Sequence, residues 1–96
     1  MTIRCVARVL AQPGKTEALR ALLLQLLEPT RKEAGCVSYQ LTQNTKDPND
    51  FTFLEEWCDE AAIAAHMNQP HVRDVLARLP ALLRADPDIR TYRVIG

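Results

Sequence analysis

Five leucines recur at helical spacing early in the chain, with strand-like runs on either side of them. They are Leu19, Leu22, Leu23, Leu26 and Leu27. Apolar residues three and four positions apart form one face of an α-helix, so we expect a helix from Lys15 onward. Pro29 lacks an amide hydrogen and crowds the carbonyl of Gln25. It predicts a kink or an end near this residue, with room for a further turn up to Glu33.

The order of the remaining patterns restricts the chain to few topologies. Strands are predicted over 3–11, 36–44, 51–58 and 89–95, with Gly35 closing the leucine helix and a polar turn over 44–50. Two further helices are predicted over 60–67, capped by Asp59, and over 70–79, begun by Pro70. This order is typical of the split βαβ, ferredoxin-like arrangement. It predicts an α+β fold with a four-stranded antiparallel sheet, its first and third strands central and its helices on one face.

The length of the chain and the open sheet face together predict a homodimer. Ninety-six residues, 47% of them hydrophobic, suit a single domain over 1–96. A domain of this size buries only roughly 60–65% of its unfolded surface. The sheet face without helices would stay exposed, and a second copy packed against it would cover it.

Charge and cysteine usage exclude several classes of protein. Twelve basic and twelve acidic residues are interspersed, so no basic stripe predicts a nucleic-acid partner. No apolar run reaches the roughly 20 residues of a membrane span, and the N-terminus lacks a signal-peptide layout, so we expect a cytoplasmic protein with no membrane partner. The chain has an odd number of cysteines, and they lie far apart in the sequence: Cys5, Cys36 and Cys58. This predicts that their side chains are reduced and unpaired.

The third strand carries the most unusual side-chain pattern. Alternation places Phe51, Phe53, Glu55 and Trp57 on one face, so a carboxylate lies among aromatic side chains. If Glu55 is desolvated there, its pKa is raised and it can exchange protons near neutral pH. The alternative is a structural ion pair with a cation such as Arg4 or Arg8. Trp57 suits either the core or the wall of a ligand pocket.

The two histidines are candidate proton acceptors. His66 and His71 lie five positions apart, about 140° around one continuous helix, which is not the same-face spacing of a two-histidine metal site. Pro70 interrupts that helix, so the rings can still converge on one pocket. No third ligand stands at a recognisable spacing, and we therefore predict no metal. A bond from each ring to a backbone carbonyl is the structural alternative.

The neighbouring strand offers one more polar group, and the motifs of common cofactors are absent. Alternation over 36–44 places Val37, Tyr39 and Leu41 on one face, which makes the Tyr39 hydroxyl a candidate pocket group that could equally serve packing. No glycine-rich phosphate loop, dinucleotide fingerprint or Ser-His-Asp order is present. We therefore predict no cofactor.

Several motifs, in their order along the chain, resemble the antibiotic biosynthesis monooxygenase (ABM) domain family of small dimeric α+β barrels. They are Pro13-Gly14-Lys15, Arg31-x-Glu33-x-Gly35-Cys36-x-x-Tyr39, Asp47-Pro48, Phe53-x-Glu55-x-Trp57, His66 and Pro70-His71. The resemblance covers nearly the whole chain. It implies a single ABM-like domain in a dimeric barrel.

The resemblance implies a cofactor-independent monooxygenase that oxidises a small quinol- or phenol-type aromatic with O2. Its catalytic candidates are His66 and His71, and its substrate-binding candidates are Tyr39, Phe51, Phe53, Glu55 and Trp57. A haem-degrading branch resembles this chain less, because Ala7, His66 and Leu76 stand where that branch carries Asn, Trp and His.

Two other functions stay open at this point. One is an isomerase of a small sugar-derived signalling carbonyl compound, for which Arg73 or Arg78 would have to supply an anion site. The other is a non-catalytic dimeric protein that binds ligands or responds to stress.

Overall fold

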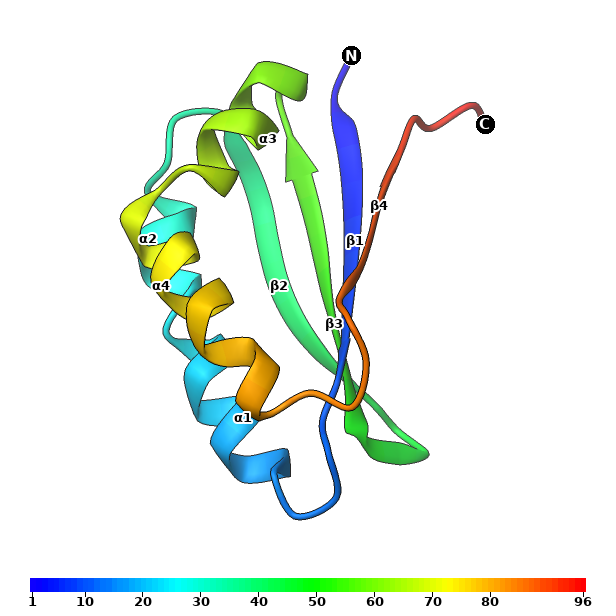
Figure 1. Cartoon of the computed structure of the whole chain (residues 1–96). Coiled ribbons are helices and arrows are strands. Elements are labelled where there is room, and N and C mark those ends of the chain that lie inside the picture. Colours follow the sequence, from blue (N-terminus) through cyan, green and yellow to red (C-terminus); the bar gives the residue numbers. More distant parts are fainter.

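The computed structural model describes the whole chain, residues 1–96, as a sheet covered on one side by helices (Figure 1). In chain order the elements are β1 (Ile3–Leu10), α1 (Thr16–Leu24), α2 (Leu27–Arg31), β2 (Cys36–Asn44), β3 (Asp47–Trp57), α3 (Glu60–Met67), α4 (Pro70–Arg78), a 3₁₀ turn η1 (Leu79–Ala81) and β4 (Asp88–Tyr92). None of the helices has the length and apolar composition needed to cross a membrane.

The sheet has the strand order that the sequence predicts. All neighbouring strands are antiparallel, in the order β2-β3-β1-β4, so β1 and β3 are central. The helices pack against one face and leave the other open (Figure 1). This is the α+β, ferredoxin-like arrangement, and that prediction is confirmed.

The core lies between the inner face of the sheet and the helices. In β3 the buried residues alternate with more exposed ones, so Phe51, Phe53, Glu55 and Trp57 do share the inner face. Cys5, Ala7 and Val9 supply the inner face of β1. The leucine repeat is buried at Leu19, Leu22, Leu23 and Leu26, as its periodicity predicts.

The first helix ends earlier than the sequence suggests. The break falls at Gln25 and Leu26, whose amides bond three residues back to Leu22 and Leu23. Pro29 then occupies the third position of α2, where an amide hydrogen has no partner within the helix. Because the proline ring cannot be accommodated against the carbonyl one turn earlier, the chain tightens and starts a second short helix.

Three strand predictions are corrected by the pairing register. β3 begins at Asp47 rather than at residue 51, because Asn44 pairs with Asp47 and shortens the turn. A register shift between Cys36 and Ser38 makes Val37 an extra residue, so it does not share the inner face with Tyr39 and is exposed. β4 ends at Tyr92 rather than at residue 95, since Tyr92 already pairs with Arg4 near the start of β1.

Candidate active site

Glu55 is a buried acid on the central strand β3, without a cationic partner. Its carboxylate accepts a hydrogen bond of 2.8 Å from Trp57 Nε1, and Cys5 lies directly across on β1. The alternative of an ion pair with Arg4 or Arg8 is wrong. Both arginines lie on the open face, where Arg4 pairs with Glu56 at 3.6 Å and Arg8 with Asp50 at 3.0 Å.

The surroundings of Glu55 change its acidity in the predicted direction. Burial raises the pKa of Glu55 to about 6, and the negative charge of Glu33 acts in the same sense. Hydrogen bonds from Trp57 and Cys5 to the carboxylate act against this shift. The carboxyl therefore exchanges its proton close to neutral pH.

Tyr39 faces Glu55 from the neighbouring strand β2. The two residues are register partners, and the Tyr39 ring lies 5.0 Å from that of Phe53 and 5.7 Å from that of His66, centre to centre. Burial, followed by the charge of Glu55, raises the pKa of Tyr39 above its ordinary value. Its hydroxyl therefore keeps its proton at neutral pH and is available as a hydrogen-bond donor.

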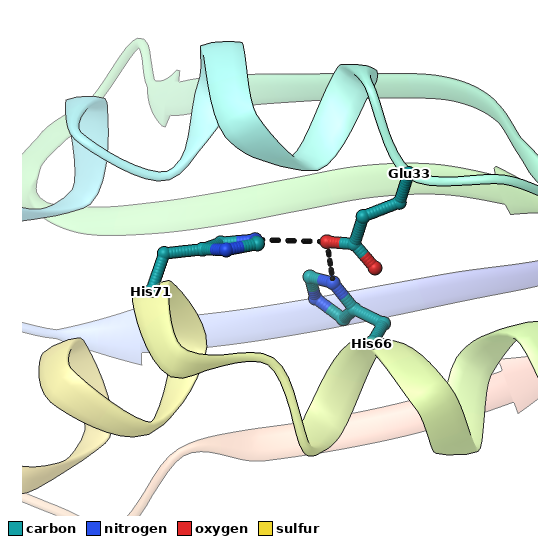
Figure 2. A group of neighbouring side chains, drawn as sticks. All are labelled: Glu33, His66 and His71. Carbon is teal, nitrogen blue, oxygen red and sulfur yellow. Dashed lines mark hydrogen bonds and ion pairs between the residues drawn. The ribbon is translucent and has the colours of Figure 1, made fainter.

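The two histidines converge on one carboxylate (Figure 2). His66 lies in the last turn of α3 and His71 in the first turn of α4, and the extended backbone of Gln69 between them changes the helix direction. His66 Nδ1 and His71 Nε2 each lie 2.8 Å from Glu33 Oε2. The structural alternative of bonds from these rings to backbone carbonyls is wrong for these two nitrogens.

Glu33 is the member of this group whose role sequence reasoning missed. It follows α2 and precedes Gly35, and its side chain is only 8% exposed. Glu33 belongs to one of the motifs that resemble the family, but no local sequence pattern predicts that its carboxylate contacts the histidines. The contacts span 33 and 38 positions of the chain, so only the packing of α3 and α4 beside this turn reveals them.

When Glu33 is ionised, its hydrogen bond with His66 determines which ring nitrogen of His66 carries the proton. A carboxylate only accepts hydrogen bonds, so the proton of a neutral His66 lies on Nδ1 and its Nε2 keeps a free electron pair. The ring is held in place between Trp57, 4.7 Å away, and Tyr39. Such an oriented imidazole is a suitable proton acceptor, and the carboxylate stabilises the imidazolium that forms.

An apolar cavity of about 130 Å³ lies between the sheet and the helices α1, α3 and α4. Fourteen of its seventeen lining residues are hydrophobic, and the others are Glu55, His66 and Pro87. Ile89 also lines it and is 45% exposed, so the cavity reaches the surface beside β4. A few polar groups in an apolar hollow are typical of small-molecule sites.

The predicted site residues are divided between the cavity and its surroundings. Tyr39, Phe53, Glu55 and His66 line it. Phe51 and Trp57, expected to form its wall, are instead buried in the core behind the lining. His71 does not line it either; its ring lies 6.3 Å from that of His66, centre to centre, and both rings contact Glu33.

Glu33, His66 and His71 are also the group of side chains best suited to hold a metal ion. Their ligand atoms, two imidazole nitrogens and one carboxylate oxygen, all lie within 4.8 Å of one another. The sequence predicts no metal because no third ligand stands at a recognisable spacing. The folded chain supplies one, Glu33, from a distant segment.

Comparison with known proteins identifies relatives along most of the chain. The profile of the family described as "Antibiotic biosynthesis monooxygenase" matches residues 2–78. The "Uncharacterized protein sll1783" of Synechocystis is 32% identical over 83 residues, 86% of this chain, and this chain spans 56% of that protein's length. The "Putative monooxygenase Rv0793" of Mycobacterium tuberculosis is 33% identical over 81 residues, 84% of this chain and 79% of that protein.

Solved structures agree with this result. That of Rv0793 superposes with a TM-score of 0.94 at 27% identity, covering 100% of this chain and 97% of the other. That of PA3566 from Pseudomonas aeruginosa gives a TM-score of 0.93 at 34% identity, covering 99% and 95%. The similarity therefore includes β4, which lies beyond the residues that the family profile matches.

Proposed function

Because the chain belongs to the antibiotic biosynthesis monooxygenase family, we propose that it is an oxidoreductase that oxidises a small electron-rich aromatic, of the quinol or phenol type, with O2. The observation that carries the proposal is the apolar cavity with His66, Glu55 and Tyr39 in its wall. An engineered apolar cavity of about 150 Å³ binds benzene. A cavity of about 130 Å³ therefore suits a substrate with a single ring.

The proposed reaction needs no organic cofactor or metal. His66 Nε2 removes the proton of a phenolic hydroxyl, and Glu33 stabilises the resulting imidazolium. The electron-rich phenolate passes one electron to O2, and the two radicals combine to form a carbon–oxygen bond. Loss of water from this peroxide leaves a second carbonyl group, so that phenol and O2 yield quinone and water.

The other cavity groups orient the substrate in this proposal. The Tyr39 hydroxyl donates a hydrogen bond to a substrate oxygen, and Glu55 accepts one from a second hydroxyl. Phe53 supplies part of the apolar wall. Exclusion of water by this wall favours electron transfer from the phenolate over its reprotonation by solvent.

The isomerase alternative lacks its anion site. Neither arginine nor lysine lines the cavity, so a phosphorylated substrate would meet no cation there. Arg73 is not among the lining residues, and Arg78 pairs with Asp74 of its own helix at 3.3 Å.

The proposed working unit is the single domain of residues 1–96 paired with a second copy. The sheet face opposite the helices is uncovered in one chain (Figure 1). Leu54 projects from the centre of that face and is 42% exposed. A second copy packed against this face would complete the dimeric α/β barrel that the resemblance implies.

Oxygen consumption with a panel of single-ring hydroquinones and phenols tests the reaction. The protein should raise the rate above autoxidation for at least one compound, and His66→Ala should abolish the increase. Glu33→Gln should lower kcat by roughly 10- to 100-fold, because an oriented general base contributes about 10²–10⁴. Glu28→Gln is the matched control, since Glu28 is an exposed carboxylate on the preceding helix.

Different results distinguish the alternatives. No rate above autoxidation across the panel would contradict the proposal. Turnover that continues in the absence of O2 would favour an isomerase. Tight aromatic binding in a thermal-shift assay without product would favour a ligand-binding protein.

A further inference from the structure

We propose that Glu33, His66 and His71 form a binding site for a divalent transition-metal ion such as Zn²⁺, and that the bound ion inhibits turnover in the adjoining cavity. The three side chains come from three separate segments and meet at one carboxylate oxygen (Figure 2). The binding is independent of the reaction proposed above. The inhibition rests on that proposed function.

The donor atoms match the preference of such ions. Two imidazole nitrogens and one carboxylate oxygen are the protein ligands of many zinc sites that keep a fourth position for water, and of non-haem iron sites. Metal–ligand bonds of about 2.0–2.2 Å hold tetrahedral ligand atoms ~3.3 Å apart. The two nitrogens each lie 2.8 Å from Glu33 Oε2, so an ion needs each of these N···O pairs to separate by ~0.5 Å. The two nitrogens lie within 4.8 Å of each other, so they would have to approach by up to ~1.5 Å.

Charge and burial point to a cation at this position. The Glu33 side chain is 8% exposed, and its only ionic partners are the two histidines, since no lysine or arginine forms an ion pair with it. A buried carboxylate is stabilised by a positive charge in contact with it, and a divalent ion bound between these groups would supply one.

The exposure of the three ligands provides an entry route. The His66 side chain is 6% exposed and that of His71 is 22% exposed. His71 therefore forms the outer edge of the group, where an ion can enter from solvent and retain a water molecule as its fourth ligand. The two buried ligands hold the ion on the inner side, next to the cavity that His66 lines.

In this proposal, metal binding changes the protonation of His66 Nε2, the ring nitrogen that is not bonded to Glu33. A neutral imidazole carries one proton, and hydrogen bonding to Glu33 places it on Nδ1. When the ion binds at Nδ1, this proton moves to Nε2 and the ring stays neutral. Nε2 then donates a hydrogen bond and no longer accepts a proton, so the proposed oxidation stops.

Titration with Co²⁺ tests the binding, because Co²⁺ takes similar ligands to Zn²⁺ and is coloured. Protein freed of metal with a chelator should bind one Co²⁺ per chain, with visible bands and without the near-ultraviolet band of thiolate ligation. Glu33→Gln and His71→Ala should each weaken binding by more than the roughly 10- to 100-fold that loss of an outer-shell partner costs. Glu28→Gln and Cys58→Ser, changes at exposed side chains, should leave the affinity unchanged.

A second measurement on the unaltered protein guards against variants that fail to fold. The chain has two histidines, so the spectrum of ¹⁵N-labelled imidazoles contains few signals. Zn²⁺ should shift the Nδ1 signal of His66 and the Nε2 signal of His71, and one equivalent should complete the change. Absence of saturable one-to-one binding, or binding that leaves these two signals unchanged, would overturn the site.

The two proposals fail in distinguishable ways. Turnover without metal that is lost on adding one equivalent of Zn²⁺ supports both. One-to-one binding without any loss of turnover overturns the inhibition. Stoichiometric binding to a protein without oxidase activity overturns the proposed function and leaves the metal site standing.

Discussion

Two buried carboxylates, Glu33 and Glu55, have very different surroundings in this protein. Glu33 is held by two imidazole rings, each 2.8 Å from the same oxygen. Glu55 accepts hydrogen bonds from the Trp57 N–H and the Cys5 thiol and has no ionic partner, and burial raises the pKa of Glu55 to about 6. The arginines of β1 cannot reach it because strand alternation directs them to the other face. Glu55 is therefore ionised at neutral pH at a cost to stability.

We expect Glu55→Gln to stabilise the protein at neutral pH but not in acid. The pKa of Glu55 is raised from 4.5 to about 6, so the folded state binds this proton more tightly than the unfolded state. The resulting stabilisation is complete below pH 4.5 and is lost as the pH rises to about 6, a difference of about 2 kcal/mol. Glutamine removes the charge and keeps an oxygen that can accept from Trp57 Nε1.

Urea unfolding of both proteins at about pH 4.5 and pH 7.5 measures this effect. The variant should be more stable by about 2 kcal/mol at the higher pH and nearly equal at the lower one. The groups that face Glu55 are Cys5 on β1, Tyr39 on β2 and Trp57 on β3, with Glu33 and His66 on the helix side. They are the same in both proteins, so the difference isolates Glu55. An equal difference at both pH values would contradict the prediction.

At the scale of elements, the turn between α2 and β2 places Glu33 beside α3. Gly35 in this turn has a φ of +88°, a conformation that side chains rarely adopt. A Cβ atom there would lie 2.7 Å from the Ala62 Cβ and 2.8 Å from the Cys58 sulfur. The glycine thus permits the close approach of α3, which carries His66. Asp59 starts that helix as predicted, accepting a hydrogen bond of 2.8 Å from the Ala62 amide.

Gly35→Ala should destabilise the fold by about 3 kcal/mol, combining backbone strain of roughly 1–2 kcal/mol with overpacking of roughly 1–3 kcal/mol. Gly14→Ala is the matched control. Gly14 has a similar φ of +81°, but nothing lies within 4 Å of its added Cβ, so we expect a loss of only about 1 kcal/mol. Chemical denaturation of the two variants yields both values. Equal losses would show that the contact with α3 contributes nothing.

At the scale of the whole molecule, the sheet is covered on one face only. The centre of its open face is formed by Leu54, whose register partners are Val6 on β1 and Gln40 on β2. The ion pairs Arg4–Glu56 and Arg8–Asp50 lie on the same face. An apolar centre with charged groups around it resembles the pattern of a subunit interface.

Leu54→Lys should therefore convert the proposed homodimer into a monomer. A charge at the centre of the interface would be buried without a partner on dimerisation. Leu24→Lys is the control, because Leu24 is 48% exposed and belongs to a helix on the opposite side of the sheet. Light scattering after size-exclusion chromatography should give twice 10.8 kDa for the unaltered protein and the control, and 10.8 kDa for Leu54→Lys. A monomeric unaltered protein would rule out the dimer.

The sequence by itself determined the element order, the strand order and the alternation in β3, because these follow from local periodicity and from the few topologies that short connections allow. That alternation placed Phe53 and Glu55 together, and both line the cavity. The sequence did not predict details of the strand register, such as the extra residue Val37 and the early end of β4, because these depend on where a neighbouring strand begins. Only the tertiary structure decided that His66 lines the cavity, that His71 and Trp57 do not, and that Glu33 contacts both histidines. Contacts across 33 and 38 residues arise from how α3 and α4 pack against the turn after α2, and no local pattern encodes them.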